Sequence, residues 1–196
     1  IEGEKEEELL DKLLERLSEK KLVKGGGQQR TDSSHVLAAV RQVNRLELVG
    51  ETMRQALNEL AVEAPDWLPE QVDPVWFERY KVRFEMYRLP DEKDEQELLQ
   101  QQIGDDGSAL LSAIYAKDAP QELCHLPAVK TMRTVWKQQY IFEQGSLRWR
   151  NQQELVACRE LIQSPYDPEA RNRTKRTTNW TGYAVHLTET CDDERP

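Results

Sequence analysis

The stretch SPYDPEARNRTKRTTNWTGYAVHLTETCDD, residues 164–193, decides how the rest of the chain is interpreted. It begins with a predicted Asp-Pro turn at Asp167–Pro168. Four basic residues follow: Arg171, Arg173, Lys175 and Arg176. Beyond them Tyr183, Val185 and Leu187 alternate with small or polar residues. That period of two, among aromatic and β-branched neighbours, predicts a strand preceded by a basic arm.

Composition describes a polar chain without a membrane segment. Of its 196 residues, 38% are hydrophobic and 32% charged, and the formal net charge is −9. No apolar run approaches the roughly 20 residues that span a bilayer, and the acidic start has no signal-peptide core. We expect a cytoplasmic protein with no membrane partner. Because the chain starts at Ile1 and stops at Pro196 just after a strand, we also expect a piece of a longer protein.

The acidic net charge argues against an even coating of basic residues that would bind nucleic acid. A local basic patch is still compatible with it, because phosphate affinity comes from clustered Lys and Arg. The three cysteines are far apart and lack CxxC spacing, so reduced thiols are expected rather than disulfides or a zinc site. The three histidines are equally scattered, and their spacing predicts no metal motif.

An amphipathic helix is predicted from Glu4 to Lys21. Its leucines recur at spacings of three and four: Leu9, Leu10, Leu13, Leu14 and Leu17. We expect this stripe to pack on a core, because the stretch covers too few heptads for a coiled coil. Gly25–Gly27 then ends the helix.

Most of the middle of the chain shows helical periodicity. Helices are predicted over residues 46–64, 75–88, 92–102, 110–115, 127–140 and 152–162, with a short extended piece at 147–150. The aromatic stripe of the second of these is expected in the core: Trp76, Tyr80, Phe84 and Tyr87. Gly104 is expected to end one helix, and Asp105 and Asp106 to form a turn and N-cap rather than a functional carboxylate pair.

A short strand with a carboxylate in it is predicted early in the chain. Within residues 28–36, small or β-branched side chains surround Asp32: Thr31, Ser33, Ser34 and Val36. A strand carboxylate usually caps, pairs or binds a cation. Asp32 therefore has two interpretations, as the cap of a turn before Ser33 or as a metal-ligand aspartate.

The domain organisation follows from these segments. We expect an N-terminal amphipathic helix over residues 1–24 and a first core strand with Asp32 over 25–45. A helical insertion over 46–163 and a basic arm with a strand hairpin over 164–196 complete the chain. This order makes sense if the two strand regions are neighbours in one sheet, with the helices inserted between them.

Two stretches carry a resemblance to a known family. The first is QRTDSSHVLAAVR, residues 29–41, and the second is SPYDPEAR with the TKR, W, GY and VHLTET that follow it, residues 164–190. Together they resemble bacterial insertion-sequence transposases of the DDE type, and the likeness covers nearly the whole chain. Each motif alone is modestly specific for this family. The occurrence of both motifs, in this order and at this spacing, is a strong signal.

The resemblance implies a fold and a chemistry. The fold would be α+β and mostly helical, a partial RNase H-like sheet with a large all-helical insertion after the first strand. Three carboxylates of such a core hold two Mg²⁺ or Mn²⁺ ions, which favour oxygen ligands and stabilise attacking and leaving oxygens during DNA strand cleavage and transfer. Asp32 would be the first catalytic and metal-binding carboxylate.

The second aspartate and the final glutamate of the family are expected beyond Pro196. We therefore expect this chain to be inactive alone, since one carboxylate cannot hold two metals. Asp192 and Asp193 are better interpreted as a solvated strand end than as the second ligand. Two other functions stay open: a non-catalytic helical DNA-binding or interaction fragment that modulates a full-length transposase, and a self-sufficient metal nuclease.

The basic arm is the candidate DNA-binding site. Its residues are Arg171, Arg173, Lys175 and Arg176, and the alternate spacing of the first three would place them on one side of an extended arm. A merely solvated hairpin is the competing interpretation. The expected partner is DNA at transposon ends, with a homo-oligomer or full-length transposase as a protein partner.

Overall fold

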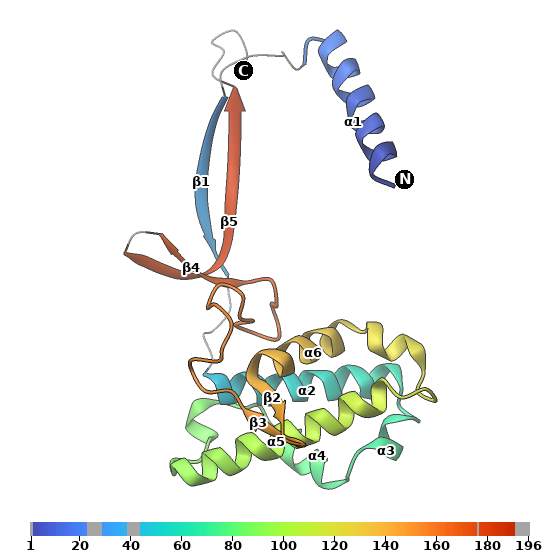
Figure 1. Cartoon of the computed structure of the whole chain (residues 1–196), viewed down its shortest axis with the longest axis vertical. Coiled ribbons are helices and arrows are strands. Elements are labelled where there is room, and N and C mark those ends of the chain that lie inside the picture. Colours follow the sequence, from blue (N-terminus) through green and yellow to red (C-terminus); the bar gives the residue numbers. More distant parts are fainter. Residues whose placement is uncertain (1, 23–28, 39–43, 176, 191–196) are drawn as a thin grey trace. The chain divides into compact units, whose positions relative to one another are not determined.

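The computed structural model describes residues 2–22, 29–38, 44–175 and 177–190; within these ranges it leaves out the side chains of 2–10, 29, 32, 33, 35, 175, 189 and 190. Figure 1 shows the helices and strands of the chain. In order they are α1 (Glu2–Glu19), β1 (Gln29–Leu37), α2 (Arg45–Glu63), α3 (Leu68–Gln71), α4 (Val75–Tyr80), η1 (Met86–Arg88), α5 (Lys93–Ile114), η2 (Gln121–His125), α6 (Pro127–Gln139), β2 (Tyr140–Glu143), β3 (Ser146–Trp149), β4 (Arg171–Lys175) and β5 (Thr178–Thr190). The predicted α+β class is confirmed.

The chain divides into two compact units. Residues 36–183 form one, here called the helical unit, and residues 1–35 with 184–196 form the other, the terminal unit. The glycine run Gly25–Gly27 lies outside the described residues.

The two strand regions that are distant in sequence are neighbours in one sheet, as predicted. The sheet has the strand order β1-β5-β4. The Ala38 amide donates to the Thr181 carbonyl (3.0 Å), and the hydroxyls of Thr31 and Thr188 lie 3.0 Å apart. Residue numbers along β5 decrease as those of the paired residues on β1 increase, so the two strands are antiparallel. The helices of the helical unit lie between these strands in the sequence.

Gly182 is required where β5 passes β1. Its φ of 156° is one that L side chains rarely adopt, and a Cβ there would overlap the backbone of Val36 and Ala38. The glycine therefore permits close approach of the two strands.

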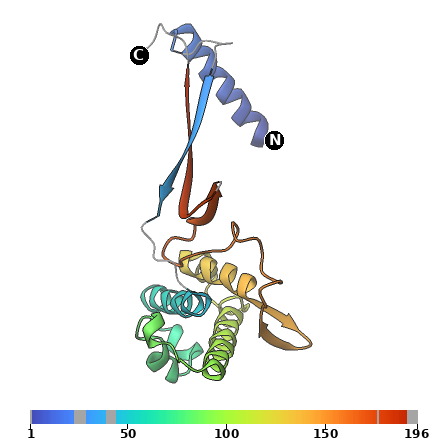
Figure 2. The same cartoon turned by 90° about the vertical axis from the view of Figure 1, so that its left-hand side faces the viewer.

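The core of the helical unit is built by α2, α5 and α6, which contact one another (Figure 2). Each contributes fully buried side chains: Met53 and Leu60 from α2, Ile103 and Leu110 from α5, and Val129, Met132 and Val135 from α6. The stripes predicted over 46–64 and 127–140 are largely confirmed. A capping box starts α2: the Asn44 side chain accepts from the Glu47 amide (2.8 Å), and the Glu47 carboxylate accepts from the Asn44 amide (2.9 Å).

The helix predicted over 75–88 is shorter in the structure. α4 ends at Tyr80, because the Phe84 amide donates to the Glu51 carboxylate (2.7 Å) instead of a helical carbonyl. Trp76, Tyr80 and Phe84 are buried as expected, but Tyr87 is exposed.

The predicted helix end at Gly104 and turn at Asp105–Gly107 are wrong. α5 continues through them to Ile114. A Cβ at Gly104 would overlap the Tyr140 ring, and one at Gly107 the Trp136 indole. These glycines serve close packing rather than chain reversal. Asp106 accepts hydrogen bonds from Arg79 and from the Tyr80 hydroxyl, so it is neither cap nor turn residue.

The predicted helix over 152–162 is absent, and its residues form turns and bends. Gln138 of α6 holds this backbone instead: its amide nitrogen donates to the Glu160 carbonyl, and its oxygen accepts from the Ile162 amide, each at 3.0 Å. Of the predicted inward face, Ile162 is buried in the core but Cys158 is exposed, so the burial that would have stabilised a short helix is incomplete.

The inserted segment is not all-helical, which corrects the expectation taken from the resemblance, because β2 and β3 form an antiparallel hairpin in it. The short extended piece predicted at 147–150 is the second strand of this hairpin. Its Trp149 packs edge-on against Tyr140, and this contact joins the hairpin to the core.

Candidate nucleic-acid interface

The predicted basic arm is β4, paired with the start of β5. The antiparallel register places Arg171 opposite Gly182 and Arg173 opposite Trp180. Since alternate residues of a strand share a face, Arg171 and Arg173 occupy the same face of β4. Lys175 takes the next alternate position, but its side chain, like all of Arg176, lies outside the described residues.

The two arginines differ in what holds them. The Arg171 guanidinium donates to the carbonyls of Pro168 and Ala170, so part of its donor capacity serves the turn before β4. Arg173 is half-buried, and its Nε is enclosed without a hydrogen-bond partner among the described residues. A buried donor without an acceptor costs about 1–3 kcal/mol.

Asp167 anchors the base of this hairpin, and the Asp-Pro turn predicted there is confirmed. The Ala170 amide donates to the Asp167 carbonyl (3.3 Å) and to its carboxylate (3.1 Å). The Tyr183 hydroxyl donates to the other carboxylate oxygen, and this hydrogen bond raises the pKa of Tyr183. One side chain thus fixes the turn and ties it to β5.

Glu51 of α2 connects the segment before β4 to the helical core. Its buried carboxylate accepts two hydrogen bonds from Arg54 (3.0 Å each), one from the Phe84 amide and one from the Tyr166 hydroxyl. Burial opposes ionisation of Glu51, but these donors outweigh it and hold its pKa below the ordinary value. Burial, and then the hydrogen bond to Glu51, raise the pKa of Tyr166.

Asp32 lies within β1, as predicted, with its side chain outside the described residues. Asp192 and Asp193 also lie outside them. Asp32 belongs to the terminal unit, whereas the β4 arginines belong to the helical unit. Among the described residues no group of three or more His, Cys, Asp or Glu side chains could hold a metal ion. A two-metal centre is therefore not provided by the part of the chain that the structure describes.

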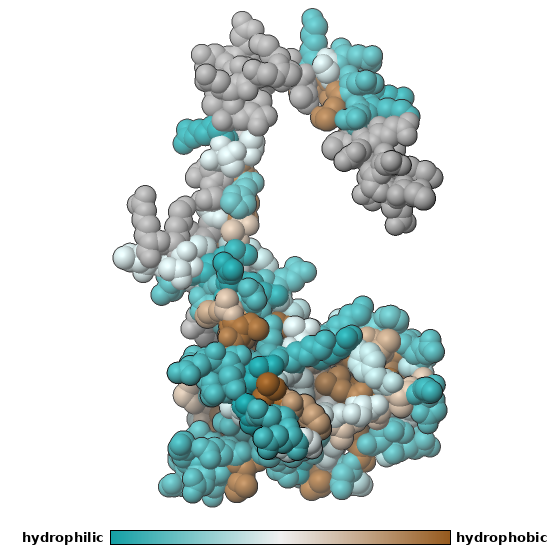
Figure 3. Space-filling model, viewed as in Figure 1, coloured by the Kyte–Doolittle hydropathy of each residue, from teal (hydrophilic) through white to brown (hydrophobic). Residues whose placement is uncertain are grey.

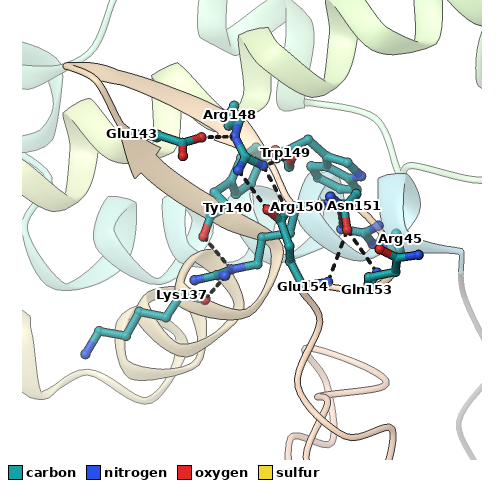
Figure 4. A network of polar contacts seen from close by, with 10 residues as sticks. All are labelled: Arg45, Lys137, Tyr140, Glu143, Arg148, Trp149, Arg150, Asn151, Gln153 and Glu154. Atoms are coloured by element: carbon teal, nitrogen blue, oxygen red, sulfur yellow. Dashed lines mark hydrogen bonds and ion pairs between the residues drawn. The ribbon is translucent and has the colours of Figure 1, made fainter.

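A second polar site lies at the start of α2 (Figure 4). Arg45 donates to the Gln139 side-chain oxygen (2.6 Å) and to the Arg150 carbonyl (2.9 Å), and its guanidinium carbon lies 4.3 Å from the centre of a Trp149 ring. Burial lowers the pKa of Arg45, which nevertheless stays cationic. Arg45 and Trp149 line a pocket of about 490 Å³ with Gln96, Gln100 and Asp91.

Arg148 holds the adjoining loop. Its guanidinium donates to both carboxylate oxygens of Glu154 (2.8 Å each) and to one carboxylate oxygen of Glu143 (2.6 Å) (Figure 4). The bidentate pair with Arg148 lowers the pKa of Glu154 to about 2. The Asn151 side chain accepts from the amides of Gln153 (2.9 Å) and Glu154 (3.1 Å), so this turn is fixed locally.

Sequence reasoning missed Glu51, Arg45 and Arg148. The extended pattern at 147–150 could have directed attention to Arg148, because it alternates with apolar neighbours. Glu51 and Arg45 lie on α2 and interact with residues far along the chain, so no local signal identified them.

Comparison of the chain with models of protein families, with curated proteins and with solved structures gives no match. In the part of the chain that the structure describes, no helix combines the length and the apolar character needed to cross a membrane.

Proposed function

We propose that this chain is part of a DDE-type DNA transposase, in which β1 and β5 are strands of an RNase H-like catalytic sheet. One observation carries the proposal. β1, with Asp32, and β5 are hydrogen-bonded neighbours although the helices of the helical unit separate them in sequence. This juxtaposition is what the two sequence motifs require, and helical propensity or composition would not have produced it.

In this proposal the β4–β5 hairpin contacts the DNA backbone. The supporting feature is the row of basic residues on β4, in which Arg173 is half-buried. The Arg173 guanidinium would meet phosphate oxygens through paired donors, the way in which Arg recognises phosphates. Arg171 and Lys175 occupy the alternate positions beside it.

Asp32 would supply one metal ligand in the complete protein. Because the described residues hold no further ligand cluster, the other carboxylates would come from elsewhere in that protein, as the resemblance implies. Bound Mg²⁺ or Mn²⁺ would supply charge stabilisation at the phosphodiester, and the role of this chain is to hold one carboxylate on a paired strand.

DNA binding by the purified chain tests the hairpin. Arg173→Glu with Lys175→Glu should weaken binding to a linear duplex at least tenfold. It should also reduce the slope of log affinity against log salt by about 2, since each neutralised phosphate contributes roughly 0.9. Electrophoretic mobility or fluorescence anisotropy at several salt concentrations measures both quantities.

The matched control is Lys130→Glu with Lys137→Glu on α6, an equal change in charge at two exposed positions away from the hairpin. It should change binding much less. Equal weakening by both pairs would mean that only net charge matters and would contradict the assigned interface.

The catalytic assignment is tested in the complete transposase that contains this chain. Asp32→Asn should abolish strand cleavage while DNA binding persists, whereas Asp118→Asn, at an exposed position, should leave cleavage intact. Undiminished cleavage by the Asp32 variant would remove Asp32 from the catalytic site.

The alternative of a non-catalytic fragment that modulates a full-length transposase is favoured by the helical unit, which has a buried core of its own. Under that alternative, adding the purified chain to the full-length enzyme changes its activity to the same extent whether or not the added chain carries Asp32→Asn. The Asp32→Asn test in the complete enzyme separates the two functions.

A further inference from the structure

A pocket of about 490 Å³ lies on the helical unit where the start of α2 meets η1, α5 and β3. That volume falls within the roughly 300–1,000 Å³ of small-molecule sites. Its described lining residues all belong to the helical unit, so the shape of the pocket comes from one compact unit. Two of these lining side chains are charged, Arg45 and Asp91. The pocket therefore has the size and the polar groups of a site for a small organic molecule.

Arg45 brings an unbalanced positive charge to this pocket. Its two hydrogen-bond acceptors, the Gln139 side-chain oxygen (2.6 Å) and the Arg150 carbonyl (2.9 Å), are neutral, and no carboxylate of the described residues forms an ion pair with it. These bonds use Nε and Nη2, so Nη1 has no hydrogen-bond partner among the described residues. Burial of a cation without a counter-ion is unfavourable, and it lowers the pKa of Arg45. An anion in the pocket would supply the missing charge.

The Arg45 guanidinium is held in place by the protein itself. Its central carbon lies 4.3 Å from the centre of a Trp149 ring (Figure 4), and its two hydrogen bonds fix its orientation. A group that is already ordered loses little conformational entropy when it binds a ligand. The paired N–H groups of a guanidinium match the two oxygens of a carboxylate. Arg45 is thus preorganised for a planar anion.

The pocket also has an apolar wall and a spare amide. Met86 is 63% exposed, and Leu89 and Pro90 are half-buried. The Gln96 amide donates to the Pro90 carbonyl (2.7 Å), which fixes this wall to α5. The Gln100 side chain makes no hydrogen bond with the described residues, so its amide is available to a ligand. The face of the helical unit seen in Figure 3 likewise mixes apolar and hydrophilic side chains.

Asp91 determines which anions are favoured. It lines the same pocket and is exposed, so its carboxylate would repel a dianion such as phosphate. The single guanidinium of Arg45 also balances one negative charge and not two. A monoanionic carboxylate fits both conditions better than a phosphate does.

We propose that this pocket binds a small organic carboxylate. Its anionic group contacts Arg45, and its apolar body packs on Met86, Leu89 and Pro90. The Gln100 amide provides a further hydrogen bond. This inference does not rest on the proposed transposase function, because the pocket shares no residue with the basic arm or with Asp32.

Benzoate is the probe, because it joins one carboxylate to a compact apolar body. In the purified chain labelled with ¹⁵N at its five tryptophans, benzoate should shift the indole signal of Trp149, which is assigned from its loss in the Trp149→Phe variant. Benzamide has a similar shape without the charge, and acetate has the charge without the apolar body. Each should bind at least tenfold more weakly than benzoate. Inorganic phosphate should also bind more weakly than benzoate.

Variants of the lining residues locate the site. Arg45→Gln should weaken benzoate binding at least tenfold, whereas Arg159→Gln, at an exposed arginine outside the lining, should leave it unchanged. Because Arg45 also has structural hydrogen bonds, Met86→Glu tests the pocket without removing them. The new charge at this exposed position should weaken benzoate binding roughly fivefold. Met86→Gln has the same length without the charge and should weaken it much less.

Four outcomes would overturn the proposal. The first is failure of benzoate to shift the Trp149 signal. Benzamide binding as tight as that of benzoate would mean that the carboxylate is not recognised. Phosphate binding as tight or tighter would make this a site for inorganic anions. Equal effects of Met86→Glu and Met86→Gln would place the bound benzoate outside this pocket.

Discussion

At the scale of single residues, Glu51 has the largest structural role that the sequence did not indicate. It is 4% exposed and accepts hydrogen bonds from Arg54, Phe84 and Tyr166. These donors come from three separate parts of the chain. One carboxylate therefore fixes the end of α4 and the segment before β4 relative to α2.

Replacing Glu51 with Gln should destabilise the helical unit by about 2–4 kcal/mol. The amide has no charge to balance Arg54, and one of its two polar atoms is a donor facing other donors. Urea denaturation followed by tryptophan fluorescence measures the loss. Glu63→Gln, at an exposed position on the same helix, is the control and should stay within about 0.5 kcal/mol of wild type.

The contribution of Glu51 should also depend on pH. Its pKa is lowered in the folded state, so the stability that it contributes is fully present above the pKa of an unfolded glutamate, about 4.3, and is lost as pH falls through the lowered folded value. The difference in unfolding free energy between wild type and Glu51→Gln should therefore shrink as the pH falls from about 7 to about 2. A constant difference over that range would show that the charge of Glu51 is not what stabilises the fold.

At the scale of elements, α5 continues through Gly104 and Gly107, although glycine usually ends helices, because these glycines are needed for packing. Gly107 lies against the Trp136 indole, and Gly104 against the Tyr140 ring. The Trp136 indole also donates to the Gly104 carbonyl (3.0 Å). The two aromatic side chains at the end of α6 thus pack into the space left by missing side chains on α5.

Gly107→Ala should destabilise the helical unit by about 1–3 kcal/mol, although alanine is favoured over glycine inside a helix by roughly 1 kcal/mol. Its Cβ would overlap the indole, and the buried site leaves little room for movement. A double-mutant cycle with Trp136→Leu checks the cause: the combined loss should be smaller than the sum by at least about 1 kcal/mol. Additive losses, or a stabilised Gly107→Ala variant, would contradict this packing.

At the scale of the whole molecule, the buried core belongs to one unit. The hydrophobic cluster described for the chain runs from Leu46 to Ile162, within the helical unit. In the described part of the terminal unit, Leu13, Leu14 and Leu187 are exposed. The two units should therefore differ in local stability.

Hydrogen exchange should reveal that difference. Backbone amides of residues 29–35 and 184–190 should exchange at least tenfold faster than those at the centres of α2 and α6, because few buried contacts oppose opening of the strand pair. Mass spectrometry of exchanged peptides measures both sets in one experiment. Equal protection would indicate that the strand pair opens only with the helical core.

The sequence by itself determined those features that depend on neighbours along the chain. The stripes of α1, α2 and α6 follow from the 3.6-residue period, the turn at Asp167 from local side-chain chemistry, and the strand after Trp180 from alternation. The pairing of β1 with β5 was also predictable, but only because the two motifs were recognised together.

Only the tertiary structure decided features whose partners lie far away in sequence. Hydrogen bonds to Gln138 replace helical ones at residues 160–162, and the Glu51 carboxylate accepts from the Phe84 amide where α4 has ended. Aromatic rings occupy the space beside Gly104 and Gly107. The same reason explains the acceptor-free Nε of Arg173 and the pocket beside Arg45, which became visible only once the chain was folded. Local preferences are worth a few tenths to about 1 kcal/mol per residue, and a buried hydrogen bond or steric overlap outweighs them.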